Sequence, residues 1–160
     1  MTETPENWVV DPGLDEGIAK LTPEMIQAAV QRVLTKESAA RLKVYLETCV
    51  RCGLCAEGCH TYLSRDKDPM FAPVGKVKRT LWELIKRDGK VSPEKLREMA
   101  QVAFTECGTC RRCSMYCPFG IDIGYLITLV RRICSLLVVS CRFCGTTPSR
   151  LQIRRTIRIM

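Results

Sequence analysis

Apolar side chains recur at helical spacing through most of the chain, in runs bounded by typical helix-start and helix-stop residues. The first run follows "TPE" at residues 22–24, where a capping threonine, a proline and an acidic residue form a helix start, and it extends to Leu34. A second run from Ser38 to about Thr48 leads directly into Cys49. The pattern therefore predicts two helices in the first third of the chain.

The same periodicity continues in the second half of the chain. Residues 74–87 have an apolar stripe that stops at "DG" (88–89), and "SPE" (92–94) starts a further run that ends near Thr105. Residues 121–137 are expected to form the last helix. No segment alternates apolar and polar residues as a half-buried strand does. We therefore expect a mostly α fold.

Three segments follow from this organisation. Residues 1–21 are predicted to form an extended N-terminal arm, because prolines and a glycine interrupt any periodicity. Residues 22–137 are predicted to form the helical domain, and residues 138–160 a basic, irregular C-terminal tail. No stretch reaches the ~18 consecutive apolar residues that a transmembrane helix needs, so we expect no membrane span.

The net charge of +8 is concentrated at the C-terminal end, where residues 123–160 contain seven arginines and no acidic residue. A solvated or poorly ordered tail explains these arginines without a function. A patch for an acidic partner or an anionic membrane surface is the alternative. Nucleic-acid binding is not expected, because no aromatic-rich or finger-like motif accompanies the charge.

Two cysteine motifs supply the candidate chemistry. Residues 49–60 are "CVRCGLCAEGCH" and residues 107–118 are "CGTCRRCSMYCP", and both follow C-x2-C-x2-C-x3-C. The acidic, polar N-terminus does not resemble a secretory signal, so metal or redox chemistry explains the cysteines better than disulfides do. Three cysteines at i, i+3 and i+6 favour an iron–sulfur cubane, whereas structural zinc usually takes two close pairs of ligands. Zinc is the alternative.

The spacing also predicts how the ligands are shared between two [4Fe-4S] clusters. In two-cluster ferredoxins the fourth cysteine of each motif ligates the other cluster. The expected ligands of the first cluster are Cys49, Cys52, Cys55 and Cys117. Those of the second are Cys107, Cys110, Cys113 and Cys59. Small residues in the motifs are expected to let the backbone approach the clusters and turn N–H groups towards their sulfurs: Gly53, Ala56, Gly58 and Gly108.

Several residues near the motifs have two interpretations. His60 follows the first motif where Pro118 follows the second, and a structural hydrogen-bonding role is favoured over one in tuning a cluster or transferring protons. Three arginines within the motifs are either docking residues for an acidic redox partner or ordinary surface charge: Arg51, Arg111 and Arg112.

Three further cysteines lack a fourth ligand for a metal site, so incidental thiols are favoured over a redox-active pair: Cys134, Cys141 and Cys144.

The motifs and their surroundings resemble a known group of proteins. The segments "LETCVRCGLCAEGCHTY", "FAPVGKVKRTLWEL" and "TECGTCRRCSMYCPFGIDIGYLITLVRR", within residues 38–135, are similar to the two-cluster α-helical ferredoxin domain of the heterodisulfide reductase C subunit. Within this group they look most like the heterodisulfide-reductase-like iron–sulfur subunits of sulfate reducers' membrane redox complexes. The resemblance implies an α-helical ferredoxin domain with two cysteine-rich cluster-binding loops.

The resemblance also implies a function and partners. It implies an electron-transfer subunit of an oxidoreductase complex, with no catalytic residues of its own, that connects a cytochrome b-type membrane subunit or quinone site to a heterodisulfide-reductase-like catalytic subunit in anaerobic respiration. The expected location is cytoplasmic, with peripheral attachment to the membrane through these partners. A catalytic fragment of a disulfide reductase or dehydrogenase, and an iron–sulfur redox sensor, are the alternatives. "GIDIG" (120–124) is not a dinucleotide motif.

One feature departs from the group. Relatives often continue into a domain with paired-cysteine "CCG" motifs, and this chain contains no "CCG". We therefore hypothesise that the sequence from about Val138 onward does not belong to the family, as a frameshift or premature end of a longer reading frame would produce.

Overall fold

The computed structural model describes residues 18–19 and 21–137, and these residues form helices without any strand. The elements in chain order are α2 (Pro23–Val33), α3 (Lys36–Thr48), α4 (Leu54–Glu57), α5 (His60–Leu63), the 3-10 helix η1 (Pro69–Phe71), α6 (Pro73–Val77), the π-helix η2 (Lys78–Trp82), α7 (Glu83–Lys86), α8 (Pro93–Gln101), the π-helix η3 (Val102–Glu106), α9 (Arg112–Met115) and α10 (Ile123–Leu136). The predicted α fold is confirmed. The predicted arm, and the tail with Cys141 and Cys144, lie outside the described residues apart from the last residues of the arm.

The helix starts form as local capping chemistry predicts. The hydroxyl of Thr22 accepts from Met25 N over 3.3 Å, and that of Ser92 accepts from Lys95 N over 3.3 Å, each ahead of a proline in the first turn. Asp122 caps α10, because its Oδ1 accepts from Tyr125 N over 2.9 Å. The expected stop after residue 87 also holds, since Gly89 adopts φ 74° and its N–H bonds to Leu84 O.

Two of the predicted helices contain a π-helical section. Residues 73–86 run without interruption as α6, η2 and α7, and residues 93–106 run as α8 and η3. The second of these ends at Glu106, directly before the first cysteine of the second motif. π-Helical turns are uncommon and are frequently found at functional sites.

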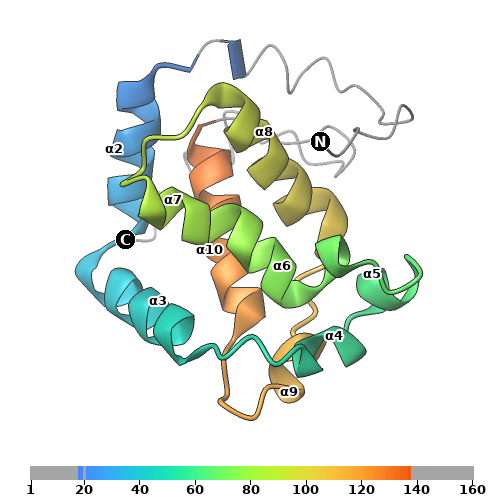
Figure 1. Ribbon diagram of the computed structural model, residues 1–160. Helices are drawn as coiled ribbons and strands as arrows, with labels where there is room; N and C mark the ends of the chain where they lie inside the picture. The colour runs from blue at the N-terminus through green and yellow to red at the C-terminus, as the bar shows by residue number, and fades with distance from the viewer. Residues whose placement is uncertain (1–17, 20, 138–160) are drawn as a thin grey trace.

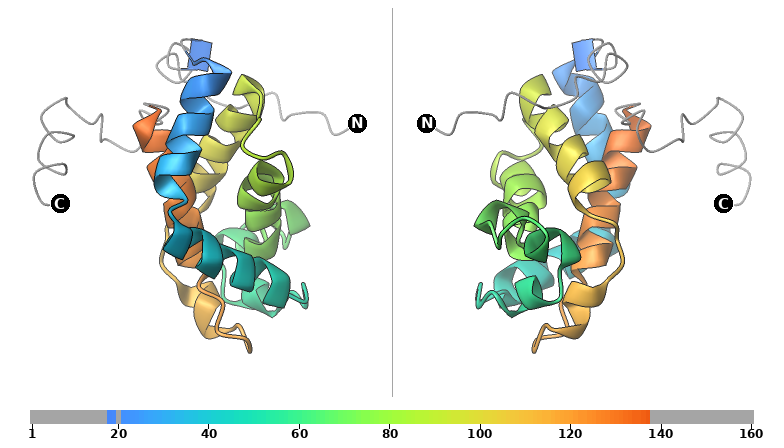
Figure 2. Two further views of the ribbon diagram at one scale, coloured as in Figure 1. Left: turned by 90° about the vertical axis from the view of Figure 1, so that its left-hand side faces the viewer. Right: turned by 90° about the vertical axis from the view of Figure 1, so that its right-hand side faces the viewer.

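The long helix α10 lies at the centre of the fold (Figure 1). It contacts α2, α8, α6 and η3, which come from both halves of the described chain. Its apolar stripe is buried against them and forms much of the core: Leu126, Ile127, Leu129, Val130 and Ile133. The views in Figure 2 show α2 and α8 at one end and α4 and α9 at the opposite end, with α10 running between them.

Two details of the predicted helices differ from the structure. The second helix begins at Lys36 rather than Ser38, because the Ser38 hydroxyl turns back to Val33 O and Thr35 O instead of capping a new turn. The cysteine motifs were expected as loops, but each contains a helix of four residues, α4 in the first motif and α9 in the second. Helices this short lack a periodic pattern and depend on tertiary contacts.

Candidate cluster-binding site

The two cysteine motifs share one backbone conformation. In each motif the residues two and four positions after the first cysteine adopt a left-handed conformation. These are Arg51 (φ 57°) and Gly53 (φ 84°) in the first motif, and Thr109 (φ 51°) and Arg111 (φ 61°) in the second. Left-handed residues of this kind build the concave backbone nests whose N–H groups bind anions, including iron–sulfur clusters. The duplication seen in the cysteines therefore extends to the main chain.

The short helices repeat in the same register and pack together. Helix α4 begins two residues after Cys52, and α9 begins two residues after Cys110. The two helices contact each other at the lower end of the molecule (Figure 1). A Cβ atom at Gly58 would lie 2.6 Å from the Tyr116 ring, so this glycine allows the two motifs to approach.

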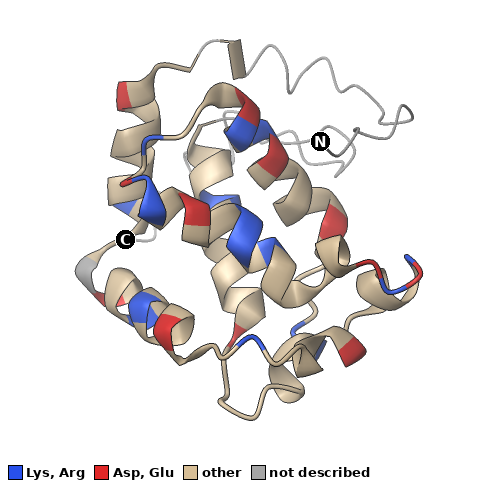
Figure 3. Ribbon diagram, in the orientation of Figure 1, with Lys and Arg blue, Asp and Glu red and all other residues tan. Residues whose placement is uncertain are grey.

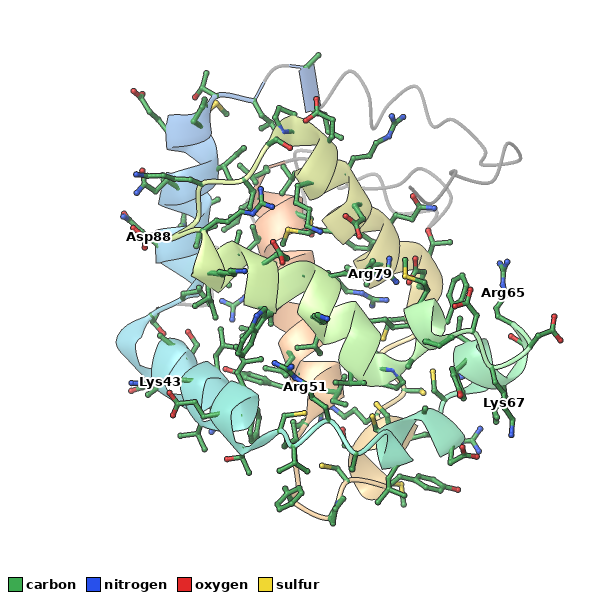
Figure 4. All side chains as sticks on the ribbon, in the orientation of Figure 1. Lys43, Arg51, Arg65, Lys67, Arg79 and Asp88 are labelled. Carbon is green, nitrogen blue, oxygen red and sulfur yellow. The ribbon has the colours of Figure 1, made fainter. Side chains whose placement is uncertain are left out.

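A cavity beside the first motif is lined by cysteines from both motifs. Cys49, Cys52 and Cys55 border it together with Cys117, the last cysteine of the second motif. Its other lining is mostly aliphatic and aromatic, and includes Val74, Val77, Trp82, Phe119 and Leu126. Several of the sulfur atoms in Figure 4 gather at this end of the molecule. Four thiols in an apolar pocket match the soft donor set of an iron–sulfur cluster.

A second group of cysteines forms around Cys113. Burial raises the pKa of Cys113 to about 12, and the neighbouring thiols of Cys107, Cys55, Cys59 and Cys110 add to this rise. Burial likewise raises the pKa of Cys55, to which Cys49, Cys117 and Cys52 contribute, while an N–H from Val74 lowers it. The first group contains the four cysteines that the spacing assigns to the first cluster. The group around Cys113 contains those assigned to the second cluster, with Cys55 of the first group also near it. Bound metal would supply the positive charge that such thiolates require.

The cysteines differ in their exposure. The second cysteine of each motif, Cys52 and Cys110, is exposed, whereas Cys55 is buried and the remaining five motif cysteines are partly buried. Within the described residues no three His, Cys, Asp or Glu side chains form a group that would hold a single metal ion. Each cysteine group therefore has one edge at the surface and its other cysteines partly or fully buried.

A buried lysine that the sequence pattern did not reveal contacts the second group. Lys76 of α6 is 1% exposed, and its Nζ donates to Glu106 O over 2.6 Å and to Cys59 Sγ over 3.6 Å. Cys59 Sγ also lies 4.0 Å from Phe71 O. Only the protonated thiol can donate a hydrogen bond to this oxygen. Thr109 N donates to Cys107 Sγ over 3.4 Å. A lysine within an amphipathic run is usually exposed, so no local signal distinguishes Lys76.

An ion pair joins the two π-helical sections beside this lysine. The Arg79 guanidinium contacts both carboxylate oxygens of Glu106, and its Nη2 also donates to Met70 O over 2.8 Å. Glu106 is 6% exposed, and Arg79 Nη1 lies 3.6 Å from the more exposed Glu98. Figure 4 shows Arg79 extending from the α6–α7 helix towards α8.

Arg131 of α10 fastens the second motif to the core. Its Nε donates to Ala103 O over 2.9 Å, its Nη2 to Cys107 O over 2.6 Å and its Nη1 to the Thr109 hydroxyl over 3.2 Å. The guanidinium also lies over the Phe104 ring. For this arginine the interpretation as solvated tail charge is wrong, because its part-buried guanidinium is hydrogen-bonded to Ala103, Cys107 and Thr109.

The other residues considered near the motifs lie as follows. Arg51 is exposed and stacks over the Trp82 ring, and Arg111 lies 3.5 Å from the Asp122 carboxylate. Arg112 is exposed, and His60 is exposed with its ring beside Gly108. Cys134 is fully buried on α10, where burial raises its pKa to about 12, so its thiol stays protonated at neutral pH.

Comparison with known proteins agrees with this geometry. Residues 45–121, which contain both motifs, match the family described as "4Fe-4S dicluster domain". Over this segment the chain is similar to that family. No solved structure matches the chain. No helix among residues 18–19 and 21–137 is both long and apolar enough to span a bilayer.

The chain is also similar to named subunits of redox complexes. It is 29% identical to the "Hdr-like menaquinol oxidoreductase iron-sulfur subunit 2" of Archaeoglobus fulgidus and 30% identical to the corresponding iron–sulfur subunit of Archaeoglobus profundus, over 87% of this chain and 24% of each relative. It is 33% identical to one of the subunits of the dihydromethanophenazine:CoB–CoM heterodisulfide reductase of Methanosarcina barkeri, over 55% of this chain and 24% of that protein.

These relatives confirm the predicted resemblance to heterodisulfide-reductase-like iron–sulfur subunits. The chain spans about a quarter of the length of the curated relatives it matches. The 4Fe-4S dicluster match at residues 45–121 lies within the part of the chain that the Archaeoglobus relatives share. The comparison therefore supports an iron–sulfur protein.

Proposed function

We propose that this chain is an electron-transfer module with two [4Fe-4S] clusters. The observation that supports it best is the meeting of the two motifs: Cys117 joins Cys49, Cys52 and Cys55 at one cavity, and Cys59 lies near Cys113 in the second group. A structural zinc site needs only one group of four ligands, whereas two mutually linked groups suit two clusters in series.

The proposed ligands are those expected from the spacing. Cys49, Cys52, Cys55 and Cys117 hold the first cluster, and Cys107, Cys110, Cys113 and Cys59 hold the second. When bound, each cluster supplies a one-electron redox centre. The protein supplies the thiolates, backbone nests that direct N–H groups towards the sulfurs, and an apolar lining that limits access of water. The exposed edges at Cys52 and Cys110 are the proposed points of electron entry and exit.

The proposed partners follow from the relatives. The Archaeoglobus subunits are named for a menaquinol oxidoreductase, and the Methanosarcina relative for a heterodisulfide reductase. We propose that this chain passes electrons between a quinone-linked, cytochrome b-type membrane subunit and a heterodisulfide-reductase-like catalytic subunit, and that these partners keep it at the membrane surface. The exposed Arg112 is a candidate for docking an acidic partner.

The first experiment measures iron, zinc and acid-labile sulfide per chain after strictly anaerobic purification. About eight irons with matching sulfide are expected for two cubane clusters. Zinc without sulfide would instead show a structural module and overturn the proposal. A regulatory sensor would show cluster-dependent binding to a macromolecule, whereas a relay shows rapid reduction and reoxidation.

The ligand assignment is tested by Cys117→Ser. This variant is expected to lose or alter the cluster of the first motif, although residue 117 belongs to the second motif. Cys141→Ser removes a cysteine outside both motifs and is the matched control, expected to keep full iron and sulfide content. Loss of only the second motif's cluster in Cys117→Ser would show that each motif supplies all four of its own ligands.

A further inference from the structure

The buried Lys76 contacts both cysteine motifs. Its Nζ lies 3.6 Å from the sulfur of Cys59, the last cysteine of the first motif, and 2.6 Å from the carbonyl oxygen of Glu106, which directly precedes the second motif. We propose that Lys76 is a positioning residue that donates a hydrogen bond to the Cys59 thiolate and so raises the reduction potential of the second cluster, leaving that of the first nearly unchanged. The inference rests on the two clusters and ligand sets proposed above.

The charge balance around Lys76 indicates an anionic neighbour. Lys76 is 1% exposed, and none of the ion pairs between described residues includes it. The nearby Glu106 carboxylate is engaged by Arg79, so two cations and one carboxylate leave a net positive charge in the interior. A buried cation is costly unless an anion compensates it. A cluster-bound Cys59 thiolate supplies that anion.

The effect on potential follows from this contact. Reduction adds negative charge to a cluster, so a hydrogen bond and a positive charge at a ligand sulfur favour the reduced form. The interaction is stronger in the protein interior than in water. Basic side chains are concentrated in the middle of the α6–α7 helix (Figure 3).

The contact distinguishes the two cysteine groups. Among the described residues, Lys76 is the only lysine or arginine whose side chain donates a hydrogen bond to a cysteine sulfur, that of Cys59. Lys76 does not line the cavity of Cys49, Cys52 and Cys55, whereas the exposed Lys78 does. The second cluster therefore becomes the preferred site for the electron, and transfer is biased towards it.

The experiment is a redox titration followed by electron paramagnetic resonance on the full chain and three variants. Lys76→Met removes the charge and the donor, Lys76→Gln keeps a neutral donor, and Lys76→Arg keeps the charge. In Lys76→Met we expect the reduced-to-oxidised ratio of one cluster to fall about tenfold at a fixed potential, which is about 59 mV for a one-electron couple. In Lys76→Gln, which loses the charge but keeps a donor, we expect a smaller fall. Lys76→Arg is expected to restore most of the ratio.

Lys86→Met is the matched control, because Lys86 is an exposed lysine at the end of the same continuous helix. It removes the same charge and is expected to shift neither cluster. Unchanged ratios in both Lys76→Met and Lys76→Gln would overturn the inference, and so would an equal shift of both clusters. A wild-type protein without two clusters would instead refute the proposed function.

A measurement on the unmutated protein covers the case in which a Lys76 variant fails to bind the second cluster. Chains labelled with ¹⁵N at the lysine side chains are reduced and studied by pulsed electron paramagnetic resonance. We expect a lysine nitrogen coupling on one reduced cluster, and its loss in Lys76→Arg, whose nitrogen is unlabelled. Absence of this coupling from the second cluster would overturn the inference.

Discussion

At the residue scale, three of the six described non-glycine residues with positive φ lie in the cysteine motifs. Of the four left-handed positions that the motifs share, only residue 53 is a glycine, and the others are Arg51, Thr109 and Arg111. A left-handed conformation costs a residue with a side chain roughly 1–2 kcal/mol. For the β-branched Thr109 it is a clear outlier, and such strain is typical of functional sites. Its position is held by Arg131, which donates to the Thr109 hydroxyl and to Cys107 O.

Replacing Arg131 by alanine is expected to loosen the second motif. The change removes hydrogen bonds to two backbone carbonyls and one hydroxyl, and hydrogen bonds to charged groups contribute about 1.5–3 kcal/mol each. We expect the free energy of unfolding to fall by about 2–4 kcal/mol and the second cluster to be lost before the first. Denaturant titration and iron content measure both effects.

Arg132→Ala is the control for this prediction. Arg132 has the same charge and lies next in the sequence, but it is exposed. A surface substitution usually changes stability by less than about 0.5 kcal/mol, so its cluster content should match that of the wild type. Equal behaviour of the two variants would show that the Arg131 contacts do not support the motif.

At the element scale, the two π-helical sections are joined by a buried ion pair. η2 supplies Arg79 and η3 supplies Glu106, and the pair lies directly before the second motif. Helix α9 is linked to α10 in a comparable way, since Asp122 accepts from the Ser114 hydroxyl while it caps α10. Polar contacts between elements, rather than the helices alone, thus position the second motif.

Removing the Glu106 carboxylate should be strongly destabilising. Glu106→Ala leaves Arg79 without its closest anion and increases the uncompensated positive charge beside Lys76. Breaking a buried ion pair from one side costs about 3–5 kcal/mol. Chemical denaturation of the variant measures this loss.

Glu98→Ala tests whether burial accounts for the effect. Glu98 also faces Arg79, but it is 39% exposed and lies 3.6 Å from Nη1. Its loss is expected to cost less than about 1 kcal/mol, as for other exposed pairs. If both variants lose the same stability, the buried pair does not have the role assigned to it.

On the scale of the whole molecule, the helical core and the cysteine motifs have different sources of stability. Helices α2, α8 and α10 share a core of fully buried aliphatic side chains. Helices α4, α5 and α9 have four residues each, far below the roughly 12–15 residues at which an isolated helix becomes marginally stable. We therefore expect the conformation of the motifs to depend on the bound clusters and on contacts with the core.

Removal of iron should unfold the motifs and leave the core. After chelation we expect most of the far-ultraviolet circular dichroism to persist, because the core is aliphatic. Hydrogen exchange should quicken in residues 49–63 and 107–117, while the interior of α10 stays protected. Untreated, cluster-loaded protein is the control. Loss of the whole helical signal on chelation would show that the clusters hold the entire fold.

Local features allowed much of this protein to be predicted from sequence. The helices starting at Pro23 and Pro93 and the stop at Gly89 were predicted because capping and periodicity act over a few residues. The cysteine spacing predicted iron–sulfur ligation, in agreement with the 4Fe-4S dicluster match over residues 45–121, and a specific ligand hypothesis for the same reason. The start of α3 and the four-residue helices were missed, because they depend on contacts beyond that range.

The sequence by itself therefore determined the helical class and the two motifs. Only the tertiary structure decided which side chains surround them. Lys76 lies 17 residues from Cys59 and 30 from Glu106, and Arg131 lies 24 from Cys107, so no local pattern marks these partners. Their roles arise because folding buries charged groups, and each buried charge must be satisfied by whatever acceptor the packed helices bring within reach.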